Sequence, residues 1–213
     1  MNHLRTFALL ISVVFHPLLM ATYACLLLFY LVPDTVYDYL TPRDTKWRIS
    51  LIVFMFSFVF PVLNIFIMYR LKRLPSMILS KQADRTSPYI MTSLFYFGLF
   101  YLMKDINIWP SLKLFVVGGG IAILLTAMIN FKTKISAHMV GMGGLLGVVI
   151  SVSYLIQFNM TPIYMSLIVL AGLVGFARLV LDEHKPFQIY LGFFLGLLLQ
   201  TILFFSFQKF IFA

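Results

Sequence analysis

Long unbroken apolar runs are the feature that most constrains the fold of this chain. One of them, from Leu114 to Met128, contains no charged residue. Such runs are typical of helices that cross the hydrocarbon core of a bilayer, whereas the strands of a transmembrane β-barrel alternate apolar and polar residues. Of the 213 residues, 62% are hydrophobic and 11% are charged, which leaves little chain for a soluble domain. The sequence therefore predicts an all-α integral membrane protein with a single transmembrane domain over residues 1–213.

The apolar stretches suggest how many times the chain crosses the membrane. We expect spans near 7–32, 49–69, 89–103, 111–130, 138–157, 161–180 and 187–211. The first has no small-residue cleavage site, so we interpret it as an uncleaved span and not as a signal peptide. The third is short and ends at Lys104 and Asp105, so it is either a seventh span or a re-entrant segment. We therefore predict six to seven transmembrane helices.

The charged residues are unevenly distributed between the connections. The formal net charge is +9, and the connection 70–88 is strongly basic, with five cations against one acid: Arg70, Lys72, Arg73, Lys81, Arg85 and Asp84. In so apolar a chain, cations are better explained as membrane anchors or as a site for an anionic headgroup than as a nucleic-acid surface. We expect membrane lipids and no nucleic acid as partners. The excess of cations predicts that this connection is cytoplasmic, in a plasma or inner membrane.

Ionisable side chains at the ends of three predicted spans form the candidate site. His138 opens the fifth span, Arg178 ends the sixth and His184 precedes the seventh, so all three are expected at the face that carries 70–88. Such residues cost free energy at a membrane unless a polar cavity or the interface accommodates them. Imidazoles beside permanent cations suit phosphate chemistry, because cations bind the phosphate oxygens while one imidazole attacks phosphorus and another protonates the leaving oxygen.

Other reactive residues in the sequence favour simpler explanations. No carboxylate cluster or thiolate set predicts a metal site, and we expect no metal and no cofactor. Cys25 is the single cysteine, which excludes a disulfide framework. His16 precedes Pro17 inside the first span, and we interpret it as a structural residue near a proline kink.

Two segments resemble signatures of a known family. Residues Arg178-Leu-Val-Leu-Asp-Glu-His184-Lys-Pro186-Phe-Gln188-Ile-Tyr-Leu-Gly192 resemble the third signature of the type 2 phosphatidic acid phosphatase (PAP2) superfamily, Arg-x5-His-x3-Asp. Gln188 stands where the family has Asp. Ser136-Ala137-His138 resembles the second signature, Pro-Ser-Gly-His. The family's first signature, Lys-x6-Arg-Pro, is missing, and its preferred stand-in is Arg85 with Lys81, or alternatively Lys132 with Lys134. The resemblance covers about residues 131–196.

This resemblance implies a PAP2-like helical bundle that hydrolyses a lipid phosphate or pyrophosphate without a metal. It makes His184 the nucleophile that forms a phosphohistidine and His138 the general acid, with Gln188 in the position of the acid that orients the nucleophile. The implied phosphate-binding residues are Arg178, Arg85, Lys81, Lys134 and Ser136. The substrate's hydrocarbon chain would lie between helices. Because Gln188 lacks the family's charge, a catalytically inactive component that binds or transports lipid phosphates is the alternative.

Overall fold

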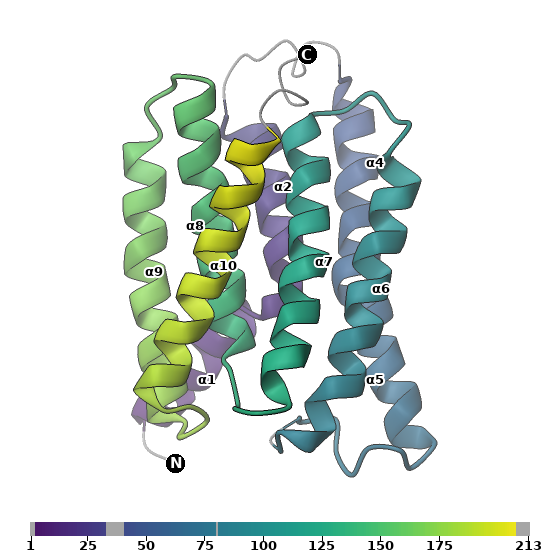
Figure 1. Cartoon of the computed structure of the whole chain (residues 1–213), viewed down its shortest axis with the longest axis vertical. Helices are drawn as coiled ribbons and strands as arrows, with labels where there is room; N and C mark the ends of the chain where they lie inside the picture. The colour runs from purple at the N-terminus through teal and green to yellow at the C-terminus, as the bar shows by residue number, and fades with distance from the viewer. Residues whose placement is uncertain (1–2, 33–40, 80, 208–213) are drawn as a thin grey trace.

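The computed structural model describes residues 3–32, 41–79 and 81–207, and every regular element in these ranges is helical. Among the described residues, six segments are long and apolar enough to cross a membrane: His3–Tyr30, Arg43–Arg70, Pro110–Asn130, Ala137–Leu155, Thr161–Val180 and Pro186–Ser206. A further helix, α6 (Thr86–Met103), runs beside α7 (Pro110–Asn130) from one end of the bundle to the other (Figure 1). The predicted all-α membrane protein with six to seven spans is confirmed. Helix α6 runs the length of the bundle but is not one of these six segments.

The direction of successive helices alternates, which places the connections at two ends of the bundle (Figure 1). The N-terminal helix α1 (His3–Val14) begins at the lower end in Figure 1. The connections that follow α5 (Phe60–Arg70), α7 and α9 (Thr161–Val180) lie at that same end. They bring the basic connection, the residues before α8 (Ala137–Leu155) and the residues before α10 (Pro186–Ser206) together.

A proline breaks the first pass into two helices. Pro17 has no N–H to donate, so α1 ends at Val14 and is followed by a short 3-10 turn, η1 (Pro17–Leu19), before α2 (Met20–Tyr30). His16 caps this turn, because its Nδ1 accepts a hydrogen bond from the backbone N–H of Leu18 at 3.3 Å. Helix α1 packs beside α9.

The second pass is longer than predicted. It begins with α4 (Arg43–Phe54), whereas the sequence placed the start of this span at residue 49. Pro42 at the helix start and Asp44 in the first turn favour a helix there, since proline suits the start of a helix and an acid interacts favourably with its dipole. A π-helical turn, η2 (Met55–Val59), connects α4 to α5 just before Pro61. The final predicted span extended to residue 211, and residues 208–211 lie outside the described residues.

Helices α8 and α10 pack more closely than side chains on both would allow. A Cβ atom on Gly196 would lie 2.0 Å from the carbonyl oxygen of Val140, and one on Gly143 would lie 2.0 Å from that of Phe193. Small residues permit such backbone contact between membrane helices. At the start of this contact the backbone N–H of Ser136 donates to the carbonyl oxygen of Gln188 at 3.3 Å. The packing therefore holds the beginning of α8 against the beginning of α10.

We expect Gly196→Ala to destabilise the protein by about 3 kcal/mol, because the new methyl group must push α8 and α10 apart. The matched control is Gly172→Ala, since a Cβ atom at Gly172 has no neighbour within 4 Å. Thermal unfolding of both variants in detergent measures the difference. Equal unfolding midpoints would contradict the close backbone contact.

Candidate active site

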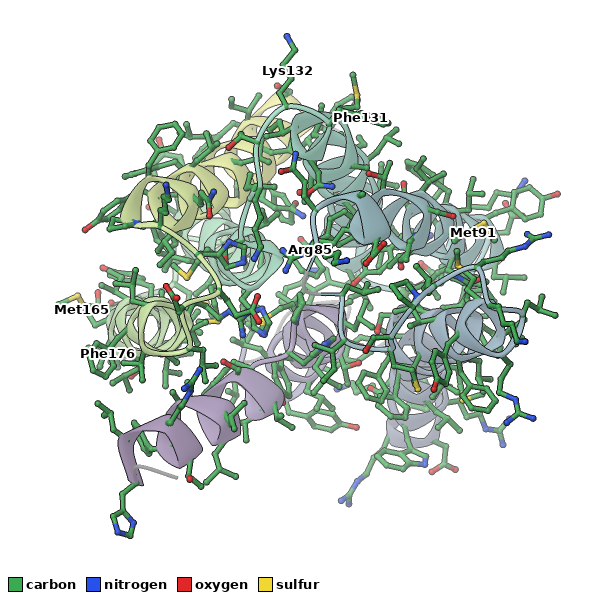
Figure 2. The ribbon with its side chains drawn as sticks, turned by 90° about the horizontal axis from the view of Figure 1, so that it is seen from below. Arg85, Met91, Phe131, Lys132, Met165 and Phe176 are labelled. Atoms are coloured by element: carbon green, nitrogen blue, oxygen red, sulfur yellow. The ribbon has the colours of Figure 1, made fainter. Side chains whose placement is uncertain are left out.

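A cavity of about 580 Å³ lies at the end of the bundle that carries the basic connection. Its polar lining comes from segments that are far apart in the sequence: Arg5, Ser12, His16, Arg85, Tyr89, Thr92, His138, Arg178, Glu183 and His184. Figure 2 looks onto this end and shows Arg85 near the middle of the helices. The structure therefore brings Arg85, Arg178, His138 and His184 to one cavity, as the sequence predicted.

Arg85 enters the cavity from a 3-10 turn, η3 (Ala83–Arg85), at the start of α6. The side chain is 6% exposed, and its Nε donates to the carbonyl oxygen of Leu79 at 2.6 Å. The turn is tied to the end of α7, because Asn130 Nδ2 donates to the carbonyl oxygen of Gln82 at 2.8 Å and the Gln82 side-chain amide donates to that of Asn130. These bonds hold the Arg85 guanidinium inside the bundle.

Arg178 is held by contacts to α1 and to the turn that follows α9. Its Nη1 donates to Ser12 Oγ at 3.3 Å, and its buried Nε has no hydrogen-bond partner among the described residues. Asp182 adopts a left-handed conformation with φ of 56°, and the N–H of Glu183 donates to the carbonyl oxygen of Arg178 at 3.2 Å. This pattern is a common helix terminus. It turns the chain so that Glu183 lies next to Arg178.

Glu183 lies among three cations, an arrangement that sequence reasoning missed. Its Oε2 is 3.3 Å from Lys134 Nζ, 3.4 Å from Arg85 Nη2 and 3.7 Å from Arg178 Nη2. The three cations therefore converge on one anionic oxygen, and a carboxylate oxygen stands where an oxygen of a bound phosphate would be stabilised. The sequence does place Glu183 between Arg178 and His184 of the signature, but it does not show where the Glu183 side chain points.

Lys134, in the connection between α7 and α8, does not line the cavity itself and joins this cluster through its contact with Glu183. Burial and the neighbouring Arg85 lower the pKa of Lys134, while its contact with Glu183 acts in the opposite direction. The cluster thus contains three cations and one acid. After pairing with Glu183 it retains two positive charges, which is the charge that complements a phosphate dianion.

His184 is presented to the cavity in a defined protonation state. Gln188 Oε1 accepts a hydrogen bond from the backbone N–H of Lys185 at 3.1 Å and from His184 Nδ1–H at 3.2 Å. A hydrogen on Nδ1 leaves a lone pair on Nε2 of the neutral ring. Burial, followed by the charges of Arg85 and Arg178, lowers the pKa of His184 to about 3. The ring is therefore neutral at physiological pH, with an unprotonated nitrogen available for attack.

His138, the second residue of α8, contacts the broken first pass. Its Nε2–H donates to the backbone carbonyl oxygen of Ser12 at 3.0 Å. That oxygen is free because the N–H of His16 donates to Val13 at the helix break. The ring of His16 meets that of His138 edge to face at 5.7 Å. His138 thus satisfies a carbonyl oxygen left open at the proline break, while the His16 side chain caps the following turn.

Three residues that the sequence suggested as phosphate ligands, two lysines and one serine, do not line this cavity. Lys81 is exposed on the surface, so Lys134 and not Lys81 accompanies Arg85. Lys132 is also exposed and points away from the bundle (Figure 2). Ser136 is buried beneath α10, where a Cβ atom on Gly192 would lie 2.7 Å from the Ser136 carbonyl oxygen. Its Oγ has no hydrogen-bond partner among the described residues.

No family model, curated protein or solved structure matches this chain. In the part of the chain that the structure describes, no group of three or more His, Cys, Asp and Glu side chains lies close enough to hold a metal ion.

Proposed function

We propose that this protein is a membrane-embedded, metal-independent phosphatase that hydrolyses a lipid phosphate or pyrophosphate through a phosphohistidine. The observation that carries the proposal is the unprotonated Nε2 of His184 at a cavity where Arg85, Lys134 and Arg178 converge. Activated nucleophiles beside a cationic cluster suit phosphoryl transfer, because the reaction requires positioning and stabilisation of phosphate charge.

The proposed reaction has two steps. The Nε2 lone pair of His184 attacks phosphorus, and the bond between phosphorus and the lipid oxygen breaks. His138, protonated on both ring nitrogens for this step, gives one proton to that leaving oxygen. Water then attacks the phosphohistidine, returns a proton to His138 and releases phosphate, which restores both histidines. Gln188 holds the Nδ1–H through both steps, and the bound phosphate takes the position of the Glu183 carboxylate among the cations.

Phosphate release by the purified protein tests this proposal. Phosphatidate, a polyprenyl phosphate and a polyprenyl diphosphate form a suitable panel, each assayed with and without EDTA. We expect release from at least one of them at a rate that EDTA does not change. Release that requires a divalent cation would contradict the proposed chemistry.

A noncatalytic lipid-phosphate binding or transport component is the second candidate function. It is favoured by Gln188, which lacks the charge of a carboxylate, and by Glu183, which already pairs with the cations. This function would show saturable binding of lipid phosphates by the wild-type protein and no release of phosphate.

The basic connection 70–88 also favours a site on the cytoplasmic side of a plasma or inner membrane, since basic connections are retained there. Labelling of Lys81→Cys with a membrane-impermeant maleimide in intact cells tests the side. Labelling from outside would contradict a cytoplasmic site.

We expect Glu183→Gln to increase the affinity for inorganic phosphate about tenfold, because the variant removes the anion that competes for Arg85, Lys134 and Arg178. Inhibition of turnover by phosphate, or direct titration, measures the change. Asp182→Asn is the matched control, because Asp182 is exposed and does not line the cavity. Weaker phosphate binding in Glu183→Gln would mean that Glu183 supports the phosphate site.

Protonation of His184 should not limit turnover between pH 5 and pH 8. Its pKa of about 3 keeps the nucleophile neutral across this range, whereas a solvent-exposed histidine would lose activity as the pH falls below about 6.5. The pH dependence of kcat measures this. An acid limb near pH 6.5 that persists after the substrate's own ionisation is accounted for would contradict the buried, cation-flanked environment.

A further inference from the structure

A second cavity of about 90 Å³ lies deeper in the bundle. Its walls come from η1, α2, α6, α7, α8 and α10, and they are mostly apolar: Pro17, Leu18, Met20, Tyr89, Thr92, Tyr96, Phe115, Gly119, Ala122, Ile123, Thr126, Ala137, Val140, Gly141, Gly144 and Gln200. Pro17, Leu18, Tyr89, Thr92 and Ala137 also line the active-site cavity. The two cavities therefore adjoin.

The polar groups in these walls are largely used within the protein. Thr92 and Thr126 donate their hydroxyl hydrogens to carbonyl oxygens of their own helices, each at 2.7 Å. Gln200 Nε2 donates to the carbonyl oxygen of Phe115 at 3.1 Å. The Gln200 side-chain oxygen lies against Gly118 and is the one buried side-chain polar atom of this wall without a hydrogen-bond partner among the described residues. Water enters a cavity when several polar groups can bind it. This cavity suits an apolar occupant better.

We infer that the deep cavity binds part of one hydrocarbon chain of the lipid whose phosphate lies in the active-site cavity, an inference that rests on the proposed function. The lining of α8 runs from Ala137 to Gly144, a distance of about 10 Å along the helix axis. A space of this length and volume takes one unbranched chain and not two side by side. The substrate class is accordingly a lipid phosphate with at least one flexible, linear hydrocarbon chain.

A groove on the outside of the bundle is the rival position for the chain. It has a volume of about 320 Å³ and is formed by α8, α9 and α10, with Gly172, Gly175 and Phe176 among its lining residues. None of its lining residues also lines the active-site cavity. A hydrocarbon chain in this groove would be separated from a phosphate in the active-site cavity. The deep cavity, in contrast, adjoins the active-site cavity, so one lipid can occupy both.

Binding of ethylphosphonate and octylphosphonate to the full-length protein in nanodiscs tests the inference. The carbon–phosphorus bond resists hydrolysis, so binding is measured whether or not the protein is a phosphatase. Two variants reduce the space in the deep cavity, Ala122→Leu and Gly144→Ala, and the second is sterically mild because its Cβ atom would lie 3.6 Å from Gln200 Cγ. Gly172→Leu reduces the outer groove instead and is the matched control.

We expect Ala122→Leu to weaken octylphosphonate binding at least tenfold and Gly144→Ala to weaken it about fourfold, the effect of one excluded methylene group. Ethylphosphonate binding should change less than twofold in both, which also shows that the variants are folded. Unchanged octylphosphonate binding in both variants, or a loss in Gly172→Leu alone, would overturn the inference while leaving the phosphate site intact. Failure of the wild-type protein to bind either phosphonate would overturn the proposed function and this inference with it.

Discussion

His184→Ala should reduce phosphate release by about 10⁴-fold or more, because the variant removes the atom that forms the bond to phosphorus. Initial rates of release from the best substrate of the lipid panel measure the loss. Octylphosphonate should still bind, since the cations that hold the phosphate remain in place. His3→Ala is the matched control, because His3 is exposed near the start of α1 and does not line the cavity.

The same assignment predicts a covalent intermediate. Brief incubation of the wild-type protein with a substrate labelled in its phosphate group should transfer the label to the protein. This label should be lost in acid, as expected for a phosphorus–nitrogen bond. His184→Ala should carry no label, and His3→Ala should carry as much as the wild type. Turnover that persists in purified His184→Ala would refute the assignment of the nucleophile.

Gln188→Asp should raise kcat about 10²-fold. Gln188 already accepts the hydrogen bond from His184 Nδ1–H at 3.2 Å, so the tautomer is set and the missing element is negative charge. A carboxylate stabilises the cationic ring that forms during attack, and replacing the orienting acid of a serine protease by its amide lowers kcat by about 10⁴-fold. The gain expected here is smaller than 10⁴-fold, because the Asp side chain is one methylene shorter than Gln and its carboxylate lies farther from the His184 ring.

Gln188→Glu is the variant matched in length, because it adds the charge while keeping the reach to His184 and to the N–H of Lys185. Single-turnover rates of both variants separate the chemical step from product release. If the wild type hydrolyses lipid phosphates and neither variant is faster, charge at position 188 does not limit the reaction. Absence of turnover in the wild type and in both variants would favour the lipid-phosphate binding function.

The class of fold, and the end of the bundle where the candidate site lies, were predictable from the sequence. Apolar runs of sufficient length must become spanning helices, because no other structure satisfies their backbone groups in a bilayer. The spans between His138, Arg178 and His184 return each residue to the same end. The contact between His184 and Gln188 was also predictable, since residues four apart at the start of a helix lie on one face.

Which cations join the candidate site, and which groups they face, depends on packing between distant segments. Lys81 and Arg85 are close in sequence, but the bonds between Gln82 and Asn130, which lie 48 positions apart, direct Arg85 inward and leave Lys81 on the surface. Glu183 is placed among the cations by the left-handed turn at Asp182. Such side-chain directions depend on contacts between distant segments, and local spacing contains no information about those contacts.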